Sequence, residues 1–194
     1  MITDFFGEED RATSVKLQPD GKIVAGGSIT DSGLFLNSAV ARYNTNGTLD
    51  TSFNGSGKSA AFIACGSNPD AGCGVSAMDI QSDGKIVITG SMEDIYLSRY
   101  NSNGSVDTNF GNSGVIITNL GGGTDNANDL KIDSNDGILV SGSVNSNGNE
   151  DIVVAKYTGA GALDTTFDNG DGYCYIFIRN QQRHCLCNFH PGEQ

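Results

Sequence analysis

One stretch, residues 41–53, indicates the architecture of this 194-residue chain: Ala41-Arg42-Tyr43-Asn44-Thr45-Asn46-Gly47-Thr48-Leu49-Asp50-Thr51-Ser52-Phe53. It returns without a gap as residues 98–110, Ser-Arg-Tyr-Asn-Ser-Asn-Gly-Ser-Val-Asp-Thr-Asn-Phe, and again as residues 155–167. The central tyrosines, Tyr43, Tyr100 and Tyr157, are spaced by 57 residues each time. A period of this length is typical of repeat architectures. The sequence therefore predicts three units, at about 1–57, 58–114 and 115–172, and an off-pattern tail at 173–194.

A second segment precedes this motif in every unit, at residues 14–28, 77–91 and 129–143. Each copy has an alternating strand, a tight turn, an apolar strand and a Gly-Ser pair. Asp20-Gly21 and Asp83-Gly84 are turn pairs that tolerate positive φ and close hairpins; in the third copy, Asp136-Gly137 is shifted by one residue. We also expect a strand ending at Tyr43 and covered on both faces, a short fourth strand at 49–53, and polar loops at 28–38 and 143–151.

The composition agrees with short strands joined by turns. The chain has 27 glycines and no tryptophan, and it lacks long helical stretches. Four short strands per unit match a β-propeller blade, so we predict an all-β fold with about three four-stranded blades. Closed propellers have about four to eight blades, which makes an open or partial propeller the expected form of the isolated chain. A ring completed by two chains is the alternative, and exposed sheet edges invite self-association.

Charge and hydropathy exclude several classes of partner. The net charge of −12 repels phosphate backbones and anionic membrane surfaces, so we predict no nucleic-acid binding and no membrane insertion. No apolar run approaches the ~20 residues of a membrane-spanning helix, and residues 1–9 lack the pattern of a signal peptide. When the first 17 residues are shifted forward by 115, residues 2–5 fall on 117–120 without a gap. The chain thus begins in phase with the repeat, partway through a unit.

The run from Leu17 to Gly27, Leu-Gln-Pro-Asp-Gly-Lys-Ile-Val-Ala-Gly-Gly, followed by Ala-Arg-Tyr-Asn-x-x-Gly-x-Leu-Asp-Thr-Ser-Phe, resembles the delta-60 repeat, a bacterial β-propeller repeat. The resemblance covers residues 1 to about 172. It implies propeller blades in large, often secreted or surface proteins, an extracellular or cell-surface location, and no general enzymatic activity. We interpret the tail after Arg179 as unrelated or out of frame, and the chain as a piece of a longer array.

Charged residues recur once per unit, and they are the first candidates for a site. Asp50, Asp107 and Asp164 each stand eight positions after a basic residue; these residues are Arg42, Arg99 and Lys156. The acids either line one end of the array as ligands or pair with the basic residue across the hairpin or with turn amides. A binding site is usually unique, whereas these groups occur in every unit, so we favour the structural pairing.

Other polar clusters offer weaker candidates for metal binding. Residues 121–129, Gly-Gly-Gly-Thr-Asp-Asn-Ala-Asn-Asp, resemble one imperfect calcium turn, and residues 168–172 lack the distal Glu of a helix–loop–helix calcium site. We interpret residues 121–129 as an inter-blade turn. Cys65 and Cys73 flank a loop and form either a small disulfide or two thiols. The set His184, Cys185, Cys187 and His190 fits no standard zinc spacing.

The sequence predicts no catalytic residue, cofactor or metal site. The only histidines are in the tail, so the repeats cannot form a Ser–His or Cys–His pair. Our functional hypothesis is a non-enzymatic structural or protein-interaction module, with a protein partner or additional blades of the same array. A calcium- or carbohydrate-binding module is the alternative, and a propeller hydrolase is a third.

Overall fold

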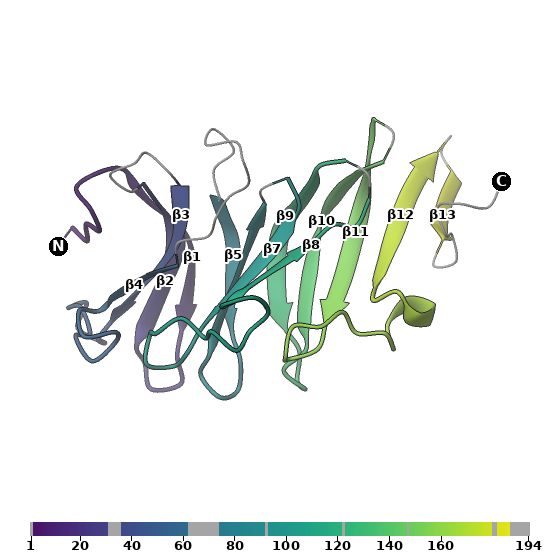
Figure 1. Ribbon diagram of the computed structural model, residues 1–194. Helices are drawn as coiled ribbons and strands as arrows, with labels where there is room; N and C mark the ends of the chain where they lie inside the picture. The colour runs from purple at the N-terminus through teal and green to yellow at the C-terminus, as the bar shows by residue number, and fades with distance from the viewer. Residues whose placement is uncertain are drawn as a thin grey trace.

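The computed structural model describes residues 2–30, 36–61, 74–91, 93–121, 123–146, 148–179 and 182–186. Its strands form three antiparallel sheets that follow one another in chain order from one end of a row to the other (Figure 1). The predicted all-β fold with three four-stranded units is confirmed. No helix in the described ranges is long and apolar enough to span a bilayer.

Each sheet is a meander in which consecutive strands are neighbours. Sheet 1 contains β1 (Asp10–Leu17), β2 (Ile23–Thr30), β3 (Leu36–Tyr43) and β4 (Lys58–Ala61). Sheet 2 contains β5 (Gly74–Ile80), β6 (Ile86–Ser91), β7 (Ile95–Tyr100) and β8 (Val115–Thr118). Sheet 3 contains β9 (Asp125–Ile132), β10 (Ile138–Ser146), β11 (Asn149–Tyr157) and β12 (Tyr173–Arg179), and β13 (Gln182–Leu186) extends its outer edge. A single 3-10 turn, η1 (Asp168–Gly170), precedes β12.

The turns between the first two strands form where the Asp-Gly pairs predict them. Gly21 and Gly84 both have a φ of +82°, and in each turn the glycine amide donates to the glutamine carbonyl three residues earlier. In the third unit the left-handed position belongs to Asp136, with a φ of +62°. The one-residue shift seen in the sequence therefore moves the left-handed residue from glycine to aspartate, which tolerates this conformation.

The predicted fourth strand at 49–53 is wrong. Leu49 forms only an isolated bridge to Tyr43, and the chain then turns through Asn54 and Gly55, both with positive φ. The fourth strand is β4, and β8 and β12 take the same place in their sheets. Each of the three begins where a new sequence unit or the tail was predicted to begin, at residues 58, 115 and 173. The unit boundaries at about 1–57, 58–114 and 115–172 remain a prediction made from the period of the sequence.

The expected polar loop at 143–151 is also wrong, because β10 and β11 continue as a ladder as far as the pair Ser146–Asn149. Of the expected loop at 28–38, β2 covers residues up to Thr30 and β3 resumes at Leu36. Backbone hydrogen bonding thus extends these strands although their side chains are polar.

A glycine near the end of the second strand permits a bulge in every sheet. The first strand of each sheet shifts register there, and a Cβ on Gly27, Gly90 or Gly142 would collide with the backbone carbonyl of Arg11, Gly74 or Asn126. Only glycine allows this approach. The Gly before each recurring Ser therefore has a structural cause.

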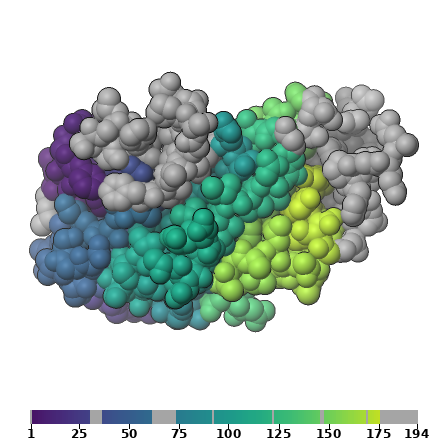
Figure 2. All heavy atoms as spheres, viewed as in Figure 1, coloured from purple at the N-terminus to yellow at the C-terminus, as the bar shows by residue number. Residues whose placement is uncertain are grey.

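The sheets pack face to face, and the core lies between them. Sheet 2 lies between sheets 1 and 3 (Figure 2). Val24, Val40 and Phe53 of sheet 1 pack with Ile88 and Tyr100 of sheet 2. We call the face that a sheet turns toward the next sheet its trailing face, and the opposite one its leading face.

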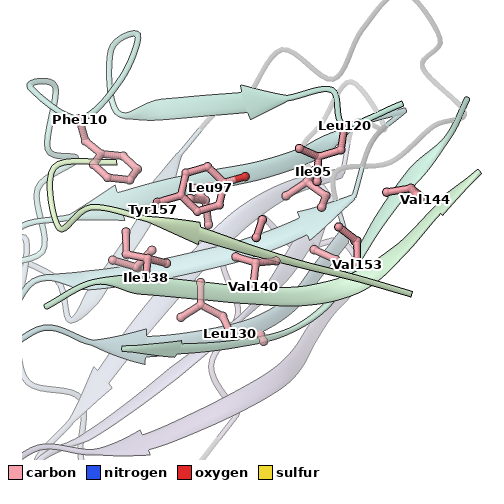
Figure 3. Close-up of a cluster of buried hydrophobic side chains, with 14 residues drawn as sticks. Ile95, Leu97, Phe110, Leu120, Leu130, Ile138, Val140, Val144, Val153 and Tyr157 are labelled. Atoms are coloured by element: carbon pink, nitrogen blue, oxygen red, sulfur yellow. The ribbon is translucent and has the colours of Figure 1, made fainter. Parts of the chain in front are cut away.

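The second core cluster repeats this arrangement one sheet further on. Leu97 and Phe110, from the trailing side of sheet 2, meet Val140, Val153 and Tyr157, from the leading face of sheet 3 (Figure 3). Every one of these five side chains is at most 1% exposed. The two interfaces thus bury the same repeat positions, as stacking of repeated units requires.

Candidate functional site

The recurring acidic and basic residues form ion pairs within each sheet. Arg42 Nε lies 2.7 Å from Asp50 Oδ2, and Arg99 Nε lies 2.9 Å from Asp107 Oδ2. Lys156 Nζ lies 3.3 Å from Asp164 Oδ2 in the third unit. The acid amide also donates to the carbonyl of its basic partner, so a backbone bond fixes the pair. The structural pairing favoured from the sequence is confirmed.

The first pair lies in a dense polar cluster. Asp50 Oδ1 accepts from the Ser52 hydroxyl at 2.6 Å and from the Ser52 amide at 3.1 Å, while Lys22 Nζ lies 2.9 Å from Oδ2. The Ser52 hydroxyl, together with the Lys22 ammonium and the Arg42 guanidinium, holds the pKa of Asp50 well below its usual range. All of these groups stabilise the ionised carboxylate. Asp50 is therefore a structural anion.

The arginines also bind the following sheet. Arg42 Nη1 donates to the Ser102 carbonyl at 2.8 Å, and Arg99 Nη1 donates to the Gly159 carbonyl at 2.6 Å. Each acceptor lies in the turn after the third strand of the next sheet. Arg99 Nη1 also donates to Gln81 Oε1 at 3.3 Å. One guanidinium thus binds both the aspartate of its own hairpin and a turn carbonyl of the next sheet, because it has several N–H donors in a fixed planar arrangement.

Each arginine covers an aromatic ring that supports the same turn. The Arg42 guanidinium lies 4.6 Å from the Phe53 ring centroid. In the next sheet, Gly104 has a φ of +92°, and a Cβ there would lie 2.8 Å from the Phe53 ring. Arg99 and Phe110 repeat this contact at 4.2 Å, beneath Gly161. The glycine of the Asn-x-x-Gly motif, which has no side chain, therefore lets the backbone pack directly against the phenylalanine ring of the preceding sheet.

A serine on the second strand provides a further bond between sheets. Ser28 Oγ accepts the amide of Val75 at 2.9 Å, and Ser91 Oγ accepts the amide of Ala127 at 2.8 Å. These amides lie beside the bulge of the next sheet's first strand, where the register of the ladder shifts. The recurring Gly-Ser pair was visible in the sequence, but nothing in it indicated which residue the hydroxyl binds.

Asp125, which the sequence offered only as part of the calcium-like run at 121–129, is a buried carboxylate. It is 0% exposed, and its Oδ2 accepts the Leu120 amide at 2.6 Å. Among the described atoms, its Oδ1 has no hydrogen-bond partner. Burial, with a smaller contribution from the nearby Asp94 charge, raises the pKa of Asp125. The nearby Tyr157 ring is buried as well, which raises the pKa of Tyr157 to about 12.

The calcium-like turn at residues 121–129 uses its carboxylates for the backbone. Asp125 binds Leu120 as described, and Asp129 Oδ1 accepts the Leu130 amide at 2.9 Å. Residues 168–172 contain η1, and Asp168 has a φ of +50°. In the ranges the structure describes, no three His, Cys, Asp or Glu side chains gather in a way that could hold a metal ion.

The remaining candidates lie mostly outside the described residues. This applies to Cys65, Cys73, Cys187 and His190. His184 and Cys185 are in β13, where their backbones pair with Phe177 and Ile176 of β12. The pairing of Cys65 with Cys73 therefore stays a prediction.

Comparison with known families agrees with this geometry. The family model described as "Domain of unknown function (DUF5122) beta-propeller" matches residues 18–53, 81–110 and 134–167. These segments include the hairpin turn and the basic–acidic pair of all three units. A search of curated proteins finds no match.

Proposed function

The chain belongs to the DUF5122 β-propeller family, and we propose that it serves as a non-enzymatic structural and protein-interaction module. One observation carries this proposal. The charged side chains that recur in every unit, which are the natural candidates for a site, already bind one another and the neighbouring backbone. Because these charged groups already have bonding partners, few of them remain to bind a substrate. Their regular spacing along the chain suits the stacking of units.

We further propose that the units are repeats of the delta-60 type. The order and spacing of the Pro-Asp-Gly-Lys turn and the Arg-Tyr-Asn-x-x-Gly-x-Leu-Asp segment support this name. The resemblance also supports a place in a larger bacterial surface or secreted protein, and hence an extracellular or cell-surface location.

Ligand titration tests the module against the calcium- or carbohydrate-binding alternative. The protein is melted in the presence of Ca²⁺ or EDTA, and its binding to a panel of glycans is measured. A ligand at 100 times its Kd stabilises a protein by about 2.7 kcal/mol, which for a chain of this size corresponds to about 5–10 °C. We expect no shift with calcium and no bound glycan.

A shift of several degrees that EDTA reverses would replace the proposed role with calcium binding. The variant Asp129→Asn then locates the ion, since this carboxylate is exposed and its only described bond is to the adjacent amide. A saturable glycan signal would favour the carbohydrate-binding module instead.

A further inference from the structure

The two end faces of the row of sheets expose positions that the internal interfaces bury. On the trailing face of sheet 3, Ile152 is 45% exposed, whereas its equivalent in sheet 2, Ile95, is 0% exposed. On the leading face of sheet 1, Val15 is 64% exposed, whereas its equivalents Met78 and Leu130 are each 1% exposed. In the described part of the chain no further sheet covers either end face, although the side chains there suit one.

The trailing face of sheet 3 repeats the groups that hold the next sheet elsewhere. Ser143 stands where Ser28 and Ser91 accept an amide, and Lys156 stands where the two arginines donate to a turn carbonyl. Phe167 is partly exposed, whereas Phe53 and Phe110, which support the next turn, are 0% exposed.

The leading face of sheet 1 exposes the complementary groups. The amide equivalent to those of Val75 and Ala127 belongs to Ala12, and the carbonyl equivalent to those of Ser102 and Gly159 belongs to Thr45; both residues are exposed. Gly47 has the positive φ of Gly104 and Gly161, but nothing described lies within 4 Å of a Cβ placed on it. Each end thus carries one donor and one acceptor that match the other end: the Ser143 hydroxyl matches the Ala12 amide, and the Lys156 ammonium matches the Thr45 carbonyl.

The side-chain volumes also complement each other. A hollow of about 450 Å³ lies on sheet 1 against Ala25 and Ala39, which stand in place of the larger Ile88 and Tyr96 of sheet 2. On the trailing face of sheet 3, Leu139 and Ile152 stand where sheet 1 has the smaller Val24 and Ser38.

We propose that two copies of this chain bind head to tail, the trailing face of sheet 3 in each copy covering the leading face of sheet 1 in the other. Two copies bring six sheets together, a number within the range of about four to eight that closed propellers use. The interface continues the repeat geometry, so each contact has two internal precedents in the same chain. This inference deepens the proposed interaction role by naming the partner as a second copy.

The N-terminal segment shows how the copies would engage. Phe5 donates its amide to Asp10 Oδ2 at 2.8 Å, as Leu120 donates to Asp125 Oδ2 at 2.6 Å. Residues 2–5 therefore contact sheet 1 in the same way that residues 117–120 contact sheet 3. In the joined pair, Thr3 stands beside Ile152 of the other copy as Thr118 stands beside Ile95, so it takes the place that Ile176 of β12 holds in the single chain, and β12 has to leave β11 there.

Sedimentation velocity and light scattering on the full chain test the pairing. We expect the mass to rise with concentration from 20.2 kDa to twice that value and to stop there. Ile152→Arg and Val15→Arg each place an unpaired charge in the contact, and each is expected to weaken association on the order of 100-fold. Ile117→Arg is the matched control, because Ile117 is 53% exposed on β8 and lies on neither end face.

Mixing the two variants identifies the head-to-tail arrangement. Ile152→Arg keeps an intact sheet 1, and Val15→Arg keeps an intact sheet 3, so an equimolar mixture should recover a 1:1 pair through one interface. Both positions are exposed in the single chain, and unchanged melting curves would show that the variants fold. A strictly monomeric wild type, a mass that grows beyond the pair, or a mixture that stays monomeric would overturn the proposal. None of these outcomes depends on the calcium and glycan titrations.

Discussion

Replacing Asp107 by asparagine removes one charge from a buried ion pair and changes little else. The Arg99 and Asp107 side chains are 9% and 6% exposed, and their closest atoms are 2.9 Å apart. An asparagine oxygen can still accept the Asn109 amide, which Asp107 Oδ1 binds at 3.2 Å. The guanidinium, however, remains buried over Phe110 without its carboxylate. The variant therefore isolates the electrostatic part of the motif.

Breaking a buried pair by removing one partner costs about 3–5 kcal/mol, because the remaining charge is uncompensated. For a chain of this size, each kcal/mol lowers the melting temperature by about 2–4 °C, so the expected decrease is about 6–20 °C. Calorimetry and urea unfolding, followed by circular dichroism near 215 nm (roughly where strands absorb), measure it. Both methods should give the same ranking of variants.

Asp164→Asn is the matched control. The equivalent pair with Lys156 is more exposed, at 27% and 16%, and no described sheet lies beyond it. Exposed pairs contribute little to stability, so this variant should melt close to the wild type. If the two variants lost equal stability, or if Asp107→Asn melted as the wild type does, the assignment of Arg99 and Asp107 as an inter-sheet support would be refuted.

Three further substitutions examine the contacts between sheets, each against an equivalent position. Gly104→Ala should destabilise the protein more than Gly47→Ala, because both carry the left-handed strain of about 1–2 kcal/mol but only the first adds a collision with the Phe53 ring; urea midpoints measure the difference, and equal midpoints would contradict it. Ser28→Ala should cost about 1–3 kcal/mol, since the Val75 amide loses its acceptor, whereas Ser143→Ala should leave a dilute, monomeric sample unchanged. Asp125→Asn should raise the melting temperature at neutral pH and have less effect in acid. Because the pKa of Asp125 is raised in the folded state, the protonated carboxyl adds stability below the ordinary carboxylate pKa of about 3.9. That stability is lost as the pH rises through the raised pKa, so the charged form is the one that destabilises the protein. Asp10→Asn, at the exposed equivalent, is its control in the same pH series, and a pH-independent effect of Asp125→Asn would count against the buried charge.

Much of the fold could be predicted from short-range patterns. The 57-residue period, the Asp-Gly turns and the alternation of Val15 and Leu17 predict hairpins in three like units, because local backbone preferences and side-chain alternation produce them. The pairing of Arg42 with Asp50 was also accessible, since both residues flank one turn. These interactions join residues that are close in the chain.

The fourth strand shows where local reasoning fails. Leu49 to Phe53 has the composition of a short strand, but Asp50 binds Ser52 and Arg42 and so holds a turn there. The strand that completes sheet 1 is Lys58–Ala61, which pairs with β3. Its small side chains give no strong strand signal, and only pairing across the sheet selects them.

The printed sequence is enough to predict a tandem array of short-stranded units whose repeats contain no histidine. The partners of the recurring side chains, by contrast, follow from the way the sheets pack on one another. The bonds from Arg42 to Ser102 and from Ser28 to Val75 join residues 60 and 47 positions apart. Such contacts depend on how one sheet lies on the next, which no local pattern encodes. The same long-range geometry leaves Val15 and Ile152 exposed at the two ends of the row, although their equivalents are buried between sheets.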